Sequence, residues 1–251
     1  MSAERKLSLA QRAQQSVEEV RLQNAQLDKL KVMDQDISEV ETIISEASGA
    51  TRNKVVQEVG VELEDLKVER LGTLLGDADT RGRYLARKKP QITAMVKQVS
   101  QIKPGSEGKE QLNALVQKAI MSGFLEGSQL ADSKIPDIGN LRIPQVESKP
   151  ATDLLYKLQR EINEIETKSI TRALQFARGL RNPFQLQEFV QKVSKLGWIK
   201  LPLPLTSLKN LDFEKLEAPA VTNPRVQASY LGLVAFIQKK GGELLDSLNR
   251  K

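Results

Sequence analysis

The sequence of 251 residues contains no cysteine and no histidine. These absences exclude disulfide bonds, zinc sites built from Cys and His, and nucleophile systems that depend on an imidazole. The net charge of +6 is unevenly spread: residues 1–49 carry nine acidic and six basic side chains, whereas residues 151–251 carry ten acidic and sixteen basic ones. An acidic first segment before a basic body suits head-to-tail electrostatic contacts or an anionic partner such as nucleic acid or a membrane surface.

Residues 3–48 form the most regular stretch, in which apolar side chains recur at steps of three and four without a proline or an aromatic residue. This spacing predicts one long helix with a coiled-coil seam. The seam slips by about one residue between Leu27 and Leu30, and a polar Asn24 lies on it, which can fix register at a cost in stability. The predicted oligomerisation seam comprises Val17, Val20, Asn24, Leu27, Leu30, Ile37, Val40 and Ile44.

Two interpretations of this helix are open. At about 1.5 Å per residue, a helix over residues 3–48 is about 69 Å long, which is more than most globular cores can cover. The favoured interpretation is that the seam pairs with a second copy of the chain or with a helix of a partner protein. The alternative is one amphipathic helix that lies along the protein's own body.

A second helical pattern extends to about Gly76 and is followed by an aspartate-rich turn. Asp77, Asp79 and Gly82 occupy the first, third and sixth positions of a calcium-loop pattern, but Lys88 stands where the pattern requires a bidentate Glu. We therefore predict an ordinary Asp-capped turn and no metal site here.

The densest basic patch of the chain comes directly after this turn. Arg83 and Arg87 share a helix face, on which two guanidinium groups could bind neighbouring phosphates while Tyr84 offers a stacking surface. The alternative is that these charges are solvated near a helix end before Pro90. The candidate nucleic-acid-binding residues of this patch are Arg81, Arg83, Tyr84, Arg87, Lys88 and Lys89.

Two shorter helices are predicted at residues 92–102 and 107–125. The segment 105–110 between them resembles a phosphate-binding loop only superficially, because its glycines are too close together and Glu110 follows the lysine. Prolines then interrupt the helical pattern over residues 127–150, which predicts a linker or a partly docked strap and a domain boundary.

The last hundred residues hold most of the aromatic side chains and are predicted to form the best-packed body. Helices are expected at residues 152–181 and 184–196, and from Pro224 to Gly241, with a short final helix after Gly242. The run 168–181 has no acidic residue and gives a second candidate nucleic-acid surface with Arg172, Arg178 and Arg181. Residues 198–205 alternate Leu and Pro, which predicts an internal strap or a ligand for a partner's groove.

The start of the sequence does not show the charged and apolar regions of a signal peptide, and the longest apolar run, residues 230–237, is too short to span a bilayer. We therefore expect a soluble protein, intracellular or part of a virion. Peripheral membrane association through the basic patches is a further alternative.

The sequence thus predicts an elongated all-α protein. Its expected segments are a coiled-coil-like helix at 1–49, a helical segment with the basic patch at 50–126, a strap at 127–150 and a compact helical domain at 151–251. The favoured function is that of a non-enzymatic assembly protein, such as a virion, phage or scaffold component, which self-associates or binds partner helices through its first helix. The main alternative is sequence-tolerant nucleic-acid binding. No cofactor is expected, and no carboxylates or lysines converge in a recognisable catalytic motif.

Overall fold

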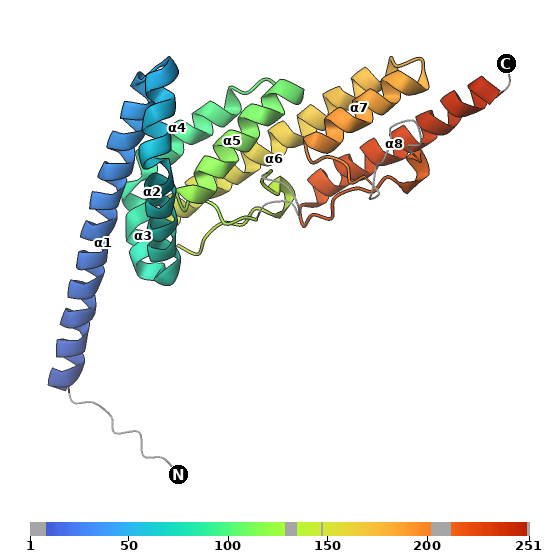
Figure 1. The fold of residues 1–251 in the computed structure, drawn as a ribbon. Helices are drawn as coiled ribbons and strands as arrows, with labels where there is room; N and C mark the ends of the chain where they lie inside the picture. Colours follow the sequence, from blue (N-terminus) through green and yellow to red (C-terminus); the bar gives the residue numbers. More distant parts are fainter. Residues whose placement is uncertain (1–8, 129–134, 147, 202–211, 250–251) are drawn as a thin grey trace, which may run out of the picture. The chain divides into compact units, whose positions relative to one another are not determined.

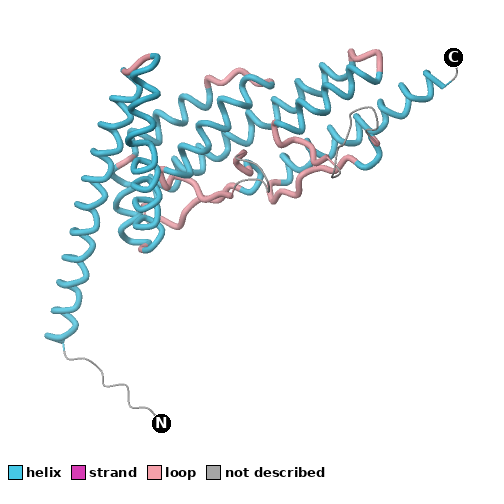
Figure 2. The backbone as a smooth tube through the Cα atoms, viewed as in Figure 1, coloured by secondary structure: helices cyan, strands magenta, loops and turns pink. Residues whose placement is uncertain are grey.

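The structure is a computed structural model that describes residues 9–128, 135–146, 148–201 and 212–249. These residues form eight α-helices and two short 3-10 helices, with no β-strand among them (Figure 1; Figure 2). The predicted all-α fold is therefore confirmed. Residues 202–205 of the Leu- and Pro-rich segment 198–205 lie outside the described residues. In chain order the elements are α1 (Leu9–Glu46), α2 (Gly49–Gly76), α3 (Ala78–Arg87), α4 (Lys89–Ser100), α5 (Ser106–Met121), η1 (Ile138–Asn140), α6 (Lys149–Arg178), α7 (Pro183–Lys195), η3 (Phe213–Lys215) and α8 (Pro224–Asn249).

The chain divides into two units at a place that composition does not mark. The first unit comprises Met1–Lys88 with Gln145–Ala151, and the second comprises Lys89–Pro144 with Thr152–Lys251. The helices α4 and α5 therefore belong with the C-terminal helices and not with α2. The Pro-rich segment was the visible boundary signal, whereas α3 and α4 are separated by Lys88 alone, which carries no linker signature.

The first unit is a helical hairpin with a third helix packed on it. Ala47 and Ser48 join α1 to α2, and Gly49 has a positive φ of 55°, a conformation that glycine adopts without steric cost. α3 contacts both helices of the hairpin. The Asp77 side chain caps α3 by accepting hydrogen bonds from the backbone N–H groups of Asp79 and Thr80, so the predicted Asp-capped turn is confirmed.

The second unit has its core between α6, α7 and α8 and the segments that connect them. The single tryptophan, Trp198, is fully buried there. Large apolar side chains interdigitate around it, as expected for a well-packed interior. The core includes Ile170, Leu186, Val190, Val193, Phe213, Val226, Leu233 and Ile237.

Both α5 and α7 end at a glycine with positive φ, Gly123 (φ 71°) and Gly197 (φ 79°). In each case the following N–H reaches back to a carbonyl five residues earlier, from Phe124 to Ala119 (2.9 Å) and from Trp198 to Val193 (3.1 Å). This termination satisfies the last carbonyl groups of the helix and turns an aromatic side chain inward. The predicted stop at Gly197 is confirmed, whereas α5 ends four residues before the predicted position.

The predicted end of the last helix at Gly241 and Gly242 is wrong, because α8 continues to Asn249. Gly241 lies against the Phe213 ring, and a Cβ atom at residue 241 would be 2.5 Å from the ring's Cγ. Glycine therefore allows η3 to approach α8 closely, although a glycine inside a helix lowers helix stability by about 1 kcal/mol relative to alanine.

The described part of the Pro-rich segment, residues 135–146, docks on the protein as a strap. This agrees with the second of the two interpretations of residues 127–150, a linker or a partly docked strap. Ile138 and Leu141 are buried, and Arg142 exchanges two backbone hydrogen bonds with Glu126 (2.9 and 2.7 Å). The Asn140 side chain donates to the carbonyl group of Ala220 and accepts from the N–H group of Thr222. These contacts hold the strap against the chain that leads into α8.

Candidate functional site

The middle of the predicted α1 seam is buried inside the chain. Leu27, Leu30 and Ile37 are buried together with Met33, and α1 packs against both α2 and α3. Val40 and Ile44 are partly buried. This portion therefore follows the alternative that the sequence left open, an amphipathic helix that covers the protein's own body.

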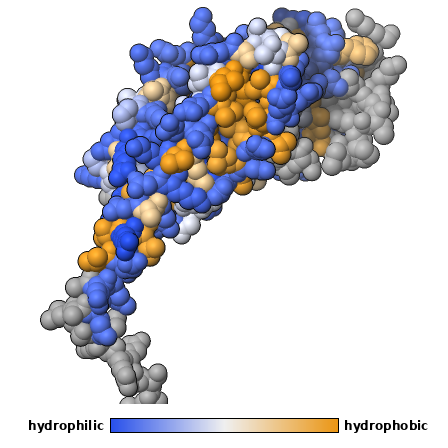
Figure 3. Space-filling model, turned by 60° about the vertical axis from the view of Figure 1, so that its left-hand side comes forward, coloured by the Kyte–Doolittle hydropathy of each residue, from blue (hydrophilic) through white to orange (hydrophobic). Residues whose placement is uncertain are grey.

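The N-terminal part of the same seam stays exposed. Val17 and Val20 expose 69% and 45% of their surface, and Asn24 is exposed as well. Every side chain from Gln14 to Leu22 is exposed. Figure 1 shows the first turns of α1 extending past the ends of α2 and α3. Figure 3 shows apolar side chains on this narrow part, near the atoms drawn in grey. We call residues 14–22 the projecting end of α1.

Polar contacts mark where α1 meets α3. The Gln23 amide donates to the Asp79 carboxylate (3.1 Å), and the Thr80 hydroxyl donates to the Gln26 amide oxygen (2.8 Å). The buried seam begins one residue later, at Leu27. The projecting end therefore lies on the N-terminal side of a well-defined contact with the rest of the first unit.

A polar cluster around Asp34 organises the first unit. Arg70 donates to Asp34 at 2.8 Å, the Tyr84 hydroxyl lies 3.1 Å from both carboxylate oxygens, and the Lys88 ammonium group lies 2.5 Å from Oδ2. The Lys88 nitrogen also lies 5.2 Å from the centre of the Tyr84 ring. Burial raises the pKa of Tyr84 well above its usual range, with Arg70 opposing the shift and Asp34 adding to it.

This cluster corrects the role predicted for part of the 81–89 patch. Tyr84 exposes only 4% of its surface and Arg81 only 8%, so neither presents a face to nucleic acid. Lys88 is engaged with Asp34. Arg83 and Arg87 are exposed, whereas Lys89 belongs to the second unit. The signal that was missed is the carboxylate of Asp34, 50 residues before Tyr84, which binds the side chains of Tyr84 and Lys88.

The predicted surface at 168–181 is exposed but does not form one face of α6. Arg172, Arg178 and Arg181 are all exposed. Arg178 is six positions after Arg172, and this spacing rotates a helix by about 240° from one side chain to the other. Arg172 donates to the carbonyl group of Pro104 (2.7 Å), and Arg181 lies beyond the end of α6.

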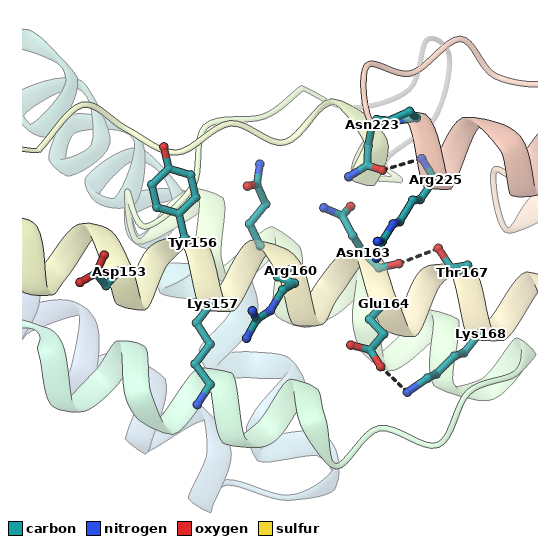
Figure 4. Close-up of a pocket in the computed structure, with 12 residues that line it drawn as sticks. Asp153, Tyr156, Lys157, Arg160, Asn163, Glu164, Thr167, Lys168, Asn223 and Arg225 are labelled. Atoms are coloured by element: carbon teal, nitrogen blue, oxygen red, sulfur yellow. Dashed lines mark hydrogen bonds and ion pairs between the residues drawn. The ribbon is translucent and has the colours of Figure 1, made fainter.

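A different basic surface lies on an earlier part of α6, where the mixture of basic and acidic residues in the sequence indicates only a solvated helix face. An open groove of about 950 Å³ is bounded by α6 and by the start of α8 (Figure 4). Its lining residues on α6 recur at steps of three and four and therefore share one face of the helix. They are Asp153, Tyr156, Lys157, Gln159, Arg160, Asn163, Glu164, Thr167 and Lys168. Arg225 of α8, which is distant from α6 in the sequence, adds a fourth basic side chain to the groove.

The basic side chains of the groove affect the pKa of Glu164. Lys168 and Glu164 form an ion pair at 2.5 Å. The hydrogen bond and charge of Lys168 lower the pKa of Glu164, and the charges of Arg160 and Arg225 lower it further. Glu164 is thus paired with Lys168, and the charges of Arg160 and Arg225 also favour its ionised form.

The second unit also contains a fully buried ion pair. The Lys109 ammonium group of α5 lies 2.7 Å from Oε1 of Glu166 in α6, and the two side chains expose 2% and 0% of their surface. The same oxygen accepts hydrogen bonds from Trp198 Nε1 (3.0 Å) and from the Tyr230 hydroxyl (2.7 Å). Burial lowers the pKa of Lys109 against the opposing effect of Glu166, and burial also raises the pKa of Tyr230.

This cluster ties three helices and the segment after α7 to a single carboxylate oxygen. Because its ionic side chains are almost completely covered, a substrate could not reach them without opening the core. Its geometry therefore indicates a structural role in fixing how these elements pack.

In the described parts of the chain, no group of three or more acidic side chains is placed to hold a metal ion, and no helix has the length and apolar character needed to cross a membrane. Comparisons with protein-family models, curated proteins and solved structures found no match to this chain.

Proposed function

We propose that this chain is a non-enzymatic assembly protein that associates through the projecting end of α1, with a second copy of itself or with a helix of a partner protein. The observation that carries the proposal is the division of the seam. Its central residues are buried in the chain, while Val17 and Val20 continue the same three-four spacing on a part of the helix where every described side chain is exposed.

The projecting end is suited to helix pairing because its helix is already formed. An isolated helix of this length would be marginal in water, since nucleation of the first turn is costly. Here residues 14–22 are continuous with a segment of α1 that packs against α2 and α3. Pairing therefore gains the burial of Val17 and Val20 without the entropy cost of forming a new helix.

Association through this short seam is expected to be weak for a single pair and stronger in an assembly with many copies. Asn24 continues the seam and is exposed, and a polar residue at such a position can restrict register and strand number. A scaffold or virion component that assembles through many equivalent contacts would combine such weak pairings into one stable structure.

The nucleic-acid alternative at residues 81–89 has less support than the assembly proposal. The structure leaves Arg83 and Arg87 exposed there, without the stacking ring of Tyr84. Two exposed arginines on one helix face are common on protein surfaces and do not by themselves indicate a ligand.

The test compares two substitutions on opposite faces of the projecting end. Val20→Asp places a charge on the seam, whereas Leu22→Asp places the same charge about 200° around the helix, at a similarly exposed residue. Light scattering across a concentration series should give a wild-type mass that rises above 28.0 kDa. Val20→Asp should lower that mass, and Leu22→Asp should leave it unchanged.

A wild-type chain that stays monomeric at every concentration would exclude self-association as the form of assembly. In that case the partner-helix form would be tested by binding of synthetic helices with a complementary seam, again with the two variants. If Val20→Asp and Leu22→Asp behaved alike in both experiments, the proposal would be wrong.

A further inference from the structure

The groove between α6 and the start of α8 is the strongest unassigned feature of the second unit. All of its lining residues belong to that unit, and its volume of about 950 Å³ is within the range of ligand-binding clefts. It contains four basic and two acidic side chains, and Lys168 is paired with one of the acids. The excess positive charge indicates an anionic ligand.

The arrangement of the remaining side chains narrows the class of ligand. Tyr156 exposes 58% of its surface on the face of α6 that lines the groove, and Lys157 and Arg160 follow it by one and four residues. Figure 4 shows the Tyr156 ring standing away from the helix, and Arg225 extending from α8 toward the residues of α6. Lys157 and Arg160 extend on the other side of α6 from the Tyr156 ring. An exposed ring and cations that line one groove are the elements of the stacking and phosphate contacts that proteins make with single-stranded nucleic acid.

We propose that this groove binds single-stranded nucleic acid without strong sequence preference. A base stacks on Tyr156, while Lys157, Arg160 and Arg225 contact the phosphates on either side of it. The Glu164–Lys168 pair lies at the far end of the α6 face and limits the excess charge there. Because Asn223 already accepts hydrogen bonds from the N–H groups of Arg225 and Val226, the side chains and not the start of α8 make the phosphate contacts.

The expected salt dependence follows from the number of cations. For single strands, each neutralised phosphate contributes about 0.7 to the slope of log affinity against log salt. Three contacts therefore give a slope of about −2, so that raising the salt from about 50 to about 150 mM weakens binding about tenfold. Loss of the stacked base should weaken binding about fivefold or more, because one base stacked on an aromatic ring makes a contribution of that order.

The experiment is fluorescence anisotropy of the full chain with a labelled single-stranded oligothymidine of about a dozen nucleotides. Tyr156→Leu removes the ring and should weaken binding about fivefold or more. Arg160→Gln with Arg225→Gln should lower the salt slope toward −0.7, about one phosphate contact. The matched control, Arg172→Gln with Arg178→Gln, removes two exposed arginines of the same helix outside the groove, and should leave both affinity and slope near the wild-type values.

Several results would overturn the proposal. Absence of binding at low salt would do so directly. Equal losses in the groove variant and the control variant would show attraction by net charge alone. Duplex DNA that bound as tightly as the single strand, without an effect of Tyr156→Leu, would exclude stacking in the groove, and competition by inorganic phosphate at millimolar concentration would indicate a small-anion site instead. Circular dichroism of each variant confirms that the helical fold is retained.

Discussion

Removal of one partner from the buried Lys109–Glu166 pair should destabilise the second unit strongly. In Lys109→Met the side chain keeps its length and loses its charge, and Glu166 remains buried with hydrogen bonds from Trp198 and Tyr230 alone. An uncompensated buried charge costs about 3–5 kcal/mol. The free energy of unfolding should fall by about that amount, which is a large part of the stability of a typical domain.

The double variant separates the ion pair from simple packing. Glu166→Gln alone leaves the ammonium group of Lys109 without its counter-charge and should also be strongly destabilising. Lys109→Met combined with Glu166→Gln removes both charges, so its cost should be smaller than the sum of the single costs by up to about 3 kcal/mol. The exposed pair of Lys168 and Glu164 supplies the control, because Lys168→Met should change stability by less than about 1 kcal/mol.

The assay is urea unfolding followed by the fluorescence of Trp198, the single tryptophan, which lies within the cluster. If Lys109→Met were no more destabilising than Lys168→Met, the buried pair would not hold the unit together as argued. Additive costs in the double variant would likewise contradict a direct interaction between the two charges.

Two further predictions concern the last helix and the Asp34 cluster. Gly241→Ala should destabilise the chain by about 1–3 kcal/mol in urea unfolding, because its Cβ would meet Phe213. Gly242→Ala is the control: it has open space around it and should be neutral or stabilise the chain by up to about 1 kcal/mol. Equal effects of the two substitutions would show that the close contact at Gly241 is not required. Because Tyr84 keeps its proton in the folded chain above pH 10 while the unfolded chain loses it, Tyr84 should lower the free energy of unfolding by about 1.4 kcal/mol for each pH unit above 10, in addition to the separate contribution of Tyr230. Tyr84→Phe should remove that part of the slope when unfolding is followed by circular dichroism at pH 9 to 11, and an unchanged slope would count against a protonated Tyr84 beside Asp34.

The sequence pattern predicts which residues form helices better than it predicts what covers them. The three-four spacing of α1 is visible from the first turn to the last, yet nothing in it separates Val20, which is exposed, from Leu30, which is completely buried. The difference depends on how far α2 and α3 reach along α1. The spacing of apolar residues is a local property, whereas the burial of their side chains depends on helices that follow 20 to 70 residues later.

Long-range polar contacts were the part that sequence reasoning could not supply. Lys109 and Glu166 are 57 residues apart and look like ordinary charged helix positions, and Arg225 gives no sign that it lies beside α6. Asp34 likewise removes Tyr84 from the predicted basic patch. Each of these contacts needs the tertiary fold, because charged residues are usually exposed and their sequence spacing carries no information about partners in other helices.

The most direct test of the assembly account is hydrogen exchange of the full chain at low and high protein concentration. The account predicts that the amides of residues 14–22 exchange more slowly at high concentration, and that Val20→Asp abolishes this change while Leu22→Asp preserves it. Amides of α8 provide the internal reference, since their exchange should not depend on concentration. Exchange in the projecting end that is the same at every concentration, with and without a candidate partner helix, would contradict the claim that this part of α1 is the surface through which the protein assembles.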